Sequence, residues 1–463
     1  MLIANRGEIA VRVIRTCRQL GLETVLVMSE ADRDSQPAQL ADRSICIGAS
    51  RPADSYLNMN AIVQAALSTQ CDAIHPGYGF LSERAPFARL CEEQGIRFIG
   101  PTAAQIESVG DKLQARAEAI AAEVPVVPGG AVESLETAQK LAGQIGAPLL
   151  IKAVGGGGGR GMKLVSRVED LGAAMDTASA EAGAAFGDAR VYLERYLASG
   201  RHVEVQVLGD GTGEVVHLGE RDCSVQRRYQ KLIEESPAPG LPPKLRIRLH
   251  DAALRFARRL KYRGAGTVEF LVDVQKDEFY FLEMNARIQV EHPVTEMVLG
   301  VDLVAAQIAV AEGRSIVVAM ARSRHGQGKG VTRGQSGCAI ECRINAEDPA
   351  NDFMPSPGTV SEALWPTGEG LRVDSHIATG SRVPPFYDSL LGKIIAHGPN
   401  RAAALQGMRT ALAATRIEGV KTNLAFHRAV LEDAQFQNGG VDTGFLPRFI
   451  ESQAGATWRA GRG

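Results

Sequence analysis

GTVEFLVDVQKDEFYFLEMNARIQVEHPVTE, residues 266–296, contains two runs rich in β-branched and aromatic residues on either side of a polar QKDE. This pattern predicts a hairpin of antiparallel strands. Centring the turn near Lys276 places Glu269 opposite Glu283, with their Cβ atoms about 5 Å apart, and puts Asn285 on the same face. Two carboxylates and an amide oxygen are hard ligands that suit Mg²⁺ or Mn²⁺. The alternative is a solvated acidic face, which leaves two like charges opposite each other without a role.

Five consecutive glycines separate another two β-like runs in LLIKAVGGGGGRGMKLVS, residues 149–166. A Walker loop is excluded, because Met162 and Lys163 stand where Lys and Ser or Thr are required. The run also matches GxGxxG, but it lacks the helix that a dinucleotide site needs next. A flexible hairpin tip or linker stays open. We favour a glycine flap between antiparallel strands, whose bare amides close over a polyphosphate beside the cation of Lys152.

The composition limits the classes of protein to which this 463-residue chain can belong. Its 51 Lys plus Arg nearly balance 53 Asp plus Glu, so no global field favours nucleic acid or an anionic membrane. The apolar runs are strand-sized, far short of the roughly 20 residues that cross a bilayer. The start, MLIANRGEIA, lacks the features of a secretory signal. Because the seven cysteines are scattered without a CxxC motif, we expect reduced thiols and a cytoplasmic protein.

The first hundred residues alternate short strands with amphipathic helices. Strands are predicted at Leu2–Ala4 and Thr24–Met28 and a helix at Glu8–Leu20, so a doubly wound, parallel α/β unit is expected. A Pro/Gly cluster, VPVVPGG, precedes a predicted helix at Ser134–Ile145, and this small module ends near ASG (198–200). From His202 to KGVTRGQSG (329–337) mostly strands and hairpins are expected.

The glycine flap, Lys152 and the acidic hairpin together resemble an ATP-grasp enzyme. Finer motifs resemble those of the biotin carboxylase family, in order along residues 2–450. These motifs are IANRGEIA (3–10), HPGYGFLSE (75–83), GDK (110–112), KAVGGGGGRGM (152–162), RHVEVQV (201–207), ERDCSVQRRYQK (220–231), EMNARIQVEHPVTE (283–296) and ECRINAEDP (341–349).

The resemblance implies an α/β and α+β protein with the ATP-grasp fold. The expected units are a doubly wound N-terminal domain at 1–111, an ATP-grasp domain at 112–312 with a mobile lid at about 130–200, and a β-rich C-terminal domain at 337–446. The implied reaction uses ATP and bicarbonate to carboxylate biotin on a carrier protein. ATP first activates bicarbonate as carboxyphosphate, a transfer that depends mostly on positioning and charge neutralisation.

The family motifs also imply roles for residues of this chain. The implied ATP ligands are Lys112, Lys152, Gly157, Gly158, Gly159, Glu194, His202, Gln226, Glu269 and Glu283, and the metal ligands are Glu269, Glu283 and Asn285. The implied bicarbonate and biotin contacts are Lys231, Arg287, Gln289, Val290, Tyr78 and Arg343, and the catalytic residues are Glu291, Arg343, Lys231 and Arg287. Glu291 is expected to take the bicarbonate proton, and Arg343 to stabilise the biotin enolate. Because the nucleotide ligands are expected elsewhere, replacing Glu291 should leave ATP affinity nearly unchanged.

The chemistry of single residues supports part of this assignment. Arg287 offers a bidentate fork for a bicarbonate carboxylate. Arg343 and Glu341 alternate with apolar residues, so both face away from the apolar side of their predicted strand. His75 and His292 have Pro neighbours, are open to a structural role, and are left out of the catalytic set.

The chain departs from the family pattern at Tyr229, where His is usual, and at Ala286, where Thr is commoner. The segment EALWPTGEG (362–370) lacks the Phe and Arg that support the dimer of the free-standing bacterial enzyme, so a homo-oligomer is left open. No M-K-M carrier hairpin occurs, and we expect the biotin carrier and the carboxyltransferase outside this sequence. Two alternatives stay open: another ATP-grasp ligase, or a non-catalytic subunit that binds nucleotide.

Overall fold

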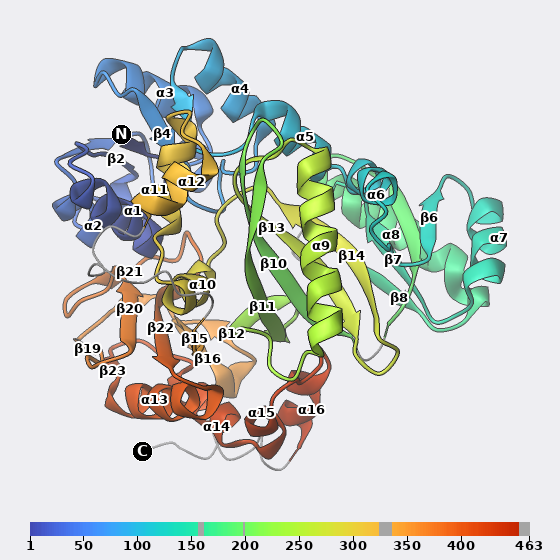
Figure 1. Ribbon diagram of the computed structural model, residues 1–463. Coiled ribbons are helices and arrows are strands. Elements are labelled where there is room, and N and C mark those ends of the chain that lie inside the picture. Colours follow the sequence, from blue (N-terminus) through green and yellow to red (C-terminus); the bar gives the residue numbers. More distant parts are fainter. Residues whose placement is uncertain (156–161, 198–199, 324–335, 453–463) are drawn as a thin grey trace.

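A parallel five-stranded sheet forms the N-terminal part of the computed structural model, which describes residues 1–155, 162–197, 200–323 and 336–452 (Figure 1). Its strand order β3-β2-β1-β4-β5 is that of a doubly wound sheet, as predicted. The strands are β1 (Leu2–Ile3), β2 (Val25–Met28), β3 (Arg43–Cys46), β4 (Ala73–His75) and β5 (Arg97–Phe98), and the helices are α1 (Gly7–Gln19), α2 (Gln36–Leu40), α3 (Met59–Ser68), α4 (Ala85–Glu93) and α5 (Ala103–Gly110).

The first helix illustrates how the local sequence sets this unit. α1 buries Ile9, Val13 and Cys17, the face that the 3.6-residue period predicts. Gly21 follows the helix with a φ of 70°, a left-handed conformation that residues with a Cβ rarely adopt, so the chain turns there toward β2.

An eight-stranded antiparallel sheet forms the middle of the molecule and continues into the C-terminal part. Its order is β14-β13-β10-β11-β12-β15-β22-β20. The strands are β10 (Arg201–Asp210), β11 (Val215–Arg227), β12 (Gln230–Ser236), β13 (Arg263–Asp273), β14 (Glu278–Asn285), β15 (Cys338–Asn345), β20 (Leu371–Ser375) and β22 (Leu390–Gly398). Figure 1 shows helix α9 (Pro243–Arg259) lying along one face of this sheet.

Four helices contradict the expected run of strands after His202. They are α9, α10 (His292–Leu299), α11 (Leu303–Ala311) and α12 (Ile316–Arg322). In α9 the buried residues Leu245, Leu249, Ala252 and Phe256 recur with the 3.6-residue period of a helix, so the expectation of strands is wrong here.

No single helix of the described residues is long and apolar enough to span a bilayer, and among them only the pair α10 and α11, bent by 96°, has the length and composition to do so together.

A smaller sheet, β6-β9-β7-β8, builds a module with its own apolar core, set apart from the rest of the chain in Figure 1. Its elements are β6 (Gly129–Val132), β7 (Leu149–Ala153), β8 (Lys163–Val165), β9 (Val191–Arg195), α7 (Leu135–Ile145) and α8 (Leu171–Phe186). β7 and β8 pair antiparallel, with Leu149 opposite Val165, as the runs around the glycines predicted. Ser134 caps α7 by accepting a hydrogen bond from the Thr137 N–H.

The remaining elements complete the body. Helix α6 (Lys112–Ala121) precedes the small module, and the C-terminal part adds β16 (Glu347–Asp348), β17 (Met354–Pro355), β18 (Gly358–Thr359), β19 (Glu362–Leu364), β21 (Arg382–Val383), β23 (Arg416–Glu418), α13 (Arg401–Ala414), α14 (Leu424–Glu432), α15 (Ala434–Asn438) and α16 (Phe445–Glu451). These C-terminal elements pack around an apolar cluster that includes Ile340, Cys342 and Ile394 of the central sheet.

Candidate active site

The face of the central sheet opposite α9 carries buried charged residues. On β10, Val203 belongs to the apolar core beneath α9, whereas His202 and Glu204 point to the other side. Glu204 is fully buried and lies opposite Glu269 of β13 and Arg221 of β11. A buried charge costs several kcal/mol unless it is paired, on the order of the net stability of a domain. The pairings on this face are therefore a requirement of the fold.

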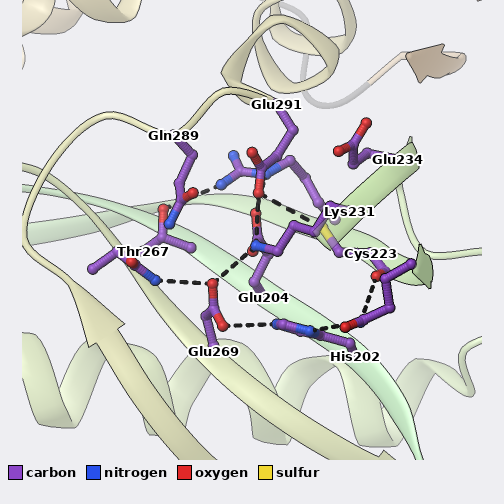
Figure 2. Close-up of polar contacts among 12 residues, drawn as sticks. His202, Glu204, Cys223, Lys231, Glu234, Thr267, Glu269, Gln289 and Glu291 are labelled. Carbon is purple, nitrogen blue, oxygen red and sulfur yellow. Dashed lines mark hydrogen bonds and ion pairs between the residues drawn. The ribbon is translucent and has the colours of Figure 1, made fainter. Parts of the chain in front are cut away.

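Lys231 of β12 joins three of the carboxylates (Figure 2). Its Nζ lies 2.5 Å from Glu204, 2.9 Å from Glu269 and 2.7 Å from Glu291. An ammonium has three N–H donors, and this arrangement uses all of them. Burial alone would lower the pKa of Lys231, but the carboxylates outweigh it and raise that pKa well above its usual range. Lys231 is therefore charged at neutral pH.

Glu291 is the residue just before α10, and two cations hold its carboxylate. Lys231 contacts Oε1, and Arg343 Nη2 donates to Oε2 at 2.9 Å. Arg343 also donates from Nε to Glu234 at 2.6 Å. Burial alone would raise the pKa of Glu291, but Lys231, Arg343 and Arg221 outweigh it and hold that pKa well below its usual range. Glu291 is thus ionised.

The β13–β14 hairpin has the predicted register, with Glu269 opposite Glu283. Glu269 is buried, accepts from Asn285 Nδ2 at 2.8 Å and lies 2.8 Å from His202 Nε2 (Figure 2). Burial alone would raise the pKa of Glu269, but its cationic neighbours lower it. Glu283 is part-exposed, and Lys112 Nζ lies 3.8 Å from its Oε2. The hairpin therefore presents one neutralised carboxylate and one open carboxylate.

Arg287 and Gln289 follow the hairpin and contact it. Arg287 donates from Nη2 to Asn285 Oδ1 at 3.0 Å and from Nη1 to Gln289 Oε1 at 3.2 Å. Its Nε donates to Glu83 of the N-terminal part at 2.7 Å. The guanidinium lies between the predicted metal ligand and the predicted bicarbonate contact.

Gln226 and His202, two of the predicted nucleotide ligands, contact each other. Gln226 Nε2 lies 3.1 Å from His202 Nδ1, which connects Gln226 to Glu269. Tyr229 sits at the tip of the β11–β12 hairpin with a φ of 66° and is exposed. The departure from His therefore places a phenol at an exposed turn.

Lys393 of β22 connects Val290 with Tyr78. The Val290 carbonyl accepts from Lys393 Nζ at 2.6 Å, and Lys393 lies 3.2 Å from Glu8, which accepts from the Tyr78 hydroxyl. Tyr78 is not in direct contact with Arg343 or Glu291 among the hydrogen bonds of the described residues.

The predicted ATP ligands of the small module form a separate pair. Lys152 Nζ lies 2.6 Å from Glu194, and Arg116 of α6 lies 3.3 Å from the same carboxylate. Burial alone would lower the pKa of Lys152, but Glu194 outweighs it and raises that pKa. The predicted flap residues 157–159 (Gly157, Gly158 and Gly159) lie outside the described residues.

Two glutamates of the cluster were missed in the sequence. Glu204 stands two residues after His202 in RHVEVQV, and the period of two could have placed both on one face. Glu234 gives no such signal, because its contact with Arg343 depends on the pairing of β12 with β15.

Among the hydrogen bonds and ion pairs of the described residues, none joins Glu291 directly to a predicted ATP ligand, but Lys231 connects it to one of them, Glu269. Lys231 contacts both Glu269 and Glu291, so one ammonium connects the hairpin to the predicted proton acceptor. His75 and His292, which are open to a structural role in the sequence, are fully buried, and burial lowers the pKa of both.

Three family models match consecutive parts of the chain. They describe the biotin carboxylase N-terminal domain (residues 1–106), the ATP binding domain of the carbamoyl-phosphate synthase L chain (residues 111–318) and the biotin carboxylase C-terminal domain (residues 341–448).

Similar proteins match over nearly the whole length. Biotin carboxylase from Nostoc sp. is 50% identical over 448 residues, which are 96% of this chain and 98% of that protein. Biotin carboxylase 1 from Bacillus subtilis is 49% identical over 451 residues, 97% of this chain and 98% of that protein.

Solved structures agree with the sequence comparisons. A biotin carboxylase from Campylobacter jejuni in an ATP-type complex has a TM-score of 0.91 and 46% identity, over 96% of this chain and 98% of that one. The biotin carboxylase domain of Hydrogenobacter thermophilus 2-oxoglutarate carboxylase, a dimer with MgADP, ADP and bicarbonate, has a TM-score of 0.89 and 44% identity, over 97% of each chain. With this agreement in sequence, fold and length, the chain belongs to the biotin carboxylase family.

Proposed function

We propose that this chain carboxylates biotin with bicarbonate and ATP, the first half-reaction of a biotin-dependent carboxylase. The observation that carries the proposal is the contact of Lys231 with Glu269 and with Glu291. Through this contact one ammonium joins the acidic hairpin to the buried carboxylate of Glu291. The hairpin suits a metal-bound nucleotide, and the carboxylate suits proton transfer. Phosphoryl transfer to a small acid such as bicarbonate needs both functions in one place.

The hairpin fits a divalent cation. Glu269, Glu283 and Asn285 supply oxygen atoms on one face, and the open carboxylate of Glu283 leaves negative charge for the ion to offset. Mg²⁺ and Mn²⁺ both suit this donor set. When bound, the ion supplies charge neutralisation to the phosphate groups. Lys112 and Lys152 are proposed to hold the same phosphates from α6 and from β7.

Bicarbonate is proposed to bind Lys231, Arg287 and Gln289. One of its oxygens attacks the γ-phosphate, which forms carboxyphosphate and ADP, and carboxyphosphate then breaks into CO₂ and phosphate. The phosphate takes the proton from biotin N1, and the resulting enolate attacks CO₂ while Arg343 offsets its negative charge. In this sequence the chain binds, orients and neutralises, which are the main sources of rate in phosphoryl transfer.

Glu291 is proposed to take the bicarbonate proton. A carboxylate with a depressed pKa is a weak base, so Lys231 and Arg343 must first turn to the substrate oxygens. As these cations leave Glu291, its pKa rises toward that of an ordinary carboxylate, and it becomes able to accept the proton.

Partners, location and domains follow the same proposal. The biotin carrier and the carboxyltransferase are proposed to be separate parts of the carboxylase, and the seven free cysteines support a cytoplasmic location. We also propose units at 1–111, 112–312 and 337–446, with 130–200 moving as a lid. The separate apolar core of the small module supports this motion.

The test is phosphate release by the purified chain with free biotin as acceptor. We expect release to require bicarbonate, biotin and a divalent cation together. Release that is independent of biotin and bicarbonate would contradict carboxylation, and a faster reaction with an amine acceptor would indicate a different ATP-grasp ligase. ATP binding without turnover, even with a biotinylated carrier, would indicate a non-catalytic subunit.

A further inference from the structure

Glu83 ends the motif HPGYGFLSE, and none of the roles above uses it. The Ala286 N–H donates to its Oε1 at 2.9 Å, and Arg287 Nε donates to its Oε2 at 2.7 Å. Each oxygen takes one donor, so a single carboxylate holds the backbone of one residue and the side chain of the next. Among the described residues, Glu83 is the one carboxylate that forms an ion pair with Arg287.

Glu83 comes from a fixed part of the N-terminal fold. It lies between β4 and α4, where the Ser82 N–H donates to the Gly79 carbonyl at 2.9 Å and the Arg84 N–H donates to the Leu81 carbonyl at 3.1 Å. Leu81 is buried in the apolar core, and α4 begins two residues after Glu83. The carboxylate is therefore presented by a short, hydrogen-bonded turn anchored at both ends.

The contact leaves Arg287 with one orientation. With Nε on Glu83, the two terminal nitrogens face Asn285 and Gln289, at 3.0 Å and 3.2 Å. A planar fork recognises a planar anion only in one plane, so fixing Nε fixes the plane in which the anion binds.

We propose that Glu83 is a positioning residue for bicarbonate: it connects the N-terminal domain to the loop after β14 and sets the plane of the Arg287 guanidinium. The inference rests on the proposed function and goes beyond it, because it gives the N-terminal domain a part in bicarbonate binding, whereas the proposed bicarbonate ligands Lys231, Arg287 and Gln289 all lie outside that domain. Lys112 and Lys152, the proposed phosphate contacts, make their ion pairs with other carboxylates, so a change at Glu83 should act on bicarbonate more than on the nucleotide.

The experiment compares Glu83→Gln and Glu83→Asp with the unmodified chain, measuring initial rates against bicarbonate at saturating ATP and biotin. Glu83→Gln keeps one acceptor but removes the charge, and we expect the KM for bicarbonate to rise about tenfold or more. The KM for ATP should change less than about twofold. Glu83→Asp keeps the charge one methylene further away, so its KM for bicarbonate should lie between the other two.

Glu92→Gln is the matched control. Glu92 is on α4, is as exposed as Glu83, and lies 3.6 Å from Arg263, away from the site. It should leave all kinetic constants unchanged. An unchanged KM for bicarbonate in Glu83→Gln would overturn the inference alone. So would a parallel rise in every KM together with a lower melting temperature, which indicates general loosening. Absence of bicarbonate-dependent turnover in the unmodified chain would overturn the proposed function and this inference together.

Discussion

Two requirements meet at Glu291. The fold needs its charge paired, because the side chain is fully buried, and Lys231 and Arg343 provide the pairing. The proposed role in catalysis needs the same oxygens free to accept a proton. Both requirements are met if Lys231 and Arg343 pair with Glu291 in the absence of substrate and with the substrate anions when these are bound. The paired state is then a resting state, which ends when the substrate anions replace Glu291 as the partner of the two cations.

The change Glu291→Gln tests this residue directly. It keeps the shape and removes the basicity, and a general base contributes roughly 10²–10⁴-fold, so biotin-dependent turnover should fall by that factor. ATP affinity should not weaken, because Lys231 keeps Glu204 and Glu269 as partners. Steady-state turnover and equilibrium ATP binding on the same preparation give both quantities.

Glu312→Gln serves as the control, since Glu312 forms a surface ion pair with Arg322 at 2.5 Å. A purely structural Glu291 would give a less stable variant with nearly normal turnover. That result would remove Glu291 from the mechanism.

The elements differ in how far they could be predicted. The β13–β14 hairpin followed from its period of two and its polar turn, and its register places Glu269 opposite Glu283. α9 was missed although Leu245, Leu249 and Phe256 have helical spacing, because β-rich runs on both sides outweighed it. Periodicity indicates whether a segment is a helix or a strand and which of its faces is buried. It does not indicate which other element packs against that face. The contacts of Glu234 with Arg343 and of Glu83 with Arg287 join distant segments and needed the folded chain.

Metal binding is proposed for this hairpin, and the change Glu283→Gln tests it. In ADP-saturated protein, Mg²⁺ should raise the free energy of unfolding, by about 2.7 kcal/mol at one hundred times its dissociation constant. Glu283→Gln removes the open carboxylate, so most of this gain should be lost. Urea unfolding with and without excess MgCl₂ measures it.

The control for the metal experiment lies on the same strand. Glu278→Gln changes an exposed carboxylate at the start of β14, which accepts a hydrogen bond from Tyr280. It should retain the full gain from Mg²⁺. An equal gain in Glu283→Gln would show that the hairpin does not hold the ion.

At the scale of the whole molecule, the central sheet connects the parts of the site. Arg343 and Lys393 stand on strands of the C-terminal part, whereas Glu269 and Lys231 stand on strands that precede it in the chain. Buried cationic and anionic side chains lie along this sheet, and each depends on partners of opposite charge to stay ionised. Histidines fill other buried positions in the neutral form. Burial lowers the pKa of His75 to about 4, of His427 to about 4 and of His376 to about 3.

His427 of α14 joins that helix to β15. Its Nε2 lies 2.7 Å from the Arg343 carbonyl oxygen, and its Nδ1 is buried without a hydrogen-bond partner among the described residues. A second proton would have no acceptor there, which agrees with the lowered pKa. Above pH 6.5, its usual pKa, the ring is neutral in both the folded and the unfolded chain. Between pH 6.5 and about pH 4 the unfolded chain binds a proton that the folded chain does not. The contribution of His427 to stability therefore decreases as the pH is lowered through this window.

The change His427→Gln removes this titration while an amide N–H stays available for the Arg343 carbonyl. We expect the stability advantage of the unmodified chain over His427→Gln to shrink by about 2 kcal/mol between about pH 7.5 and about pH 5, because each pKa unit corresponds to about 1.4 kcal/mol. Urea unfolding of both proteins at both pH values measures the difference, and the many other titrating groups cancel in it. If the two stabilities change in parallel, His427 is protonated in the folded chain as readily as in the unfolded one. That result would contradict a neutral, buried His427 ring joining α14 to β15, the strand that carries Arg343.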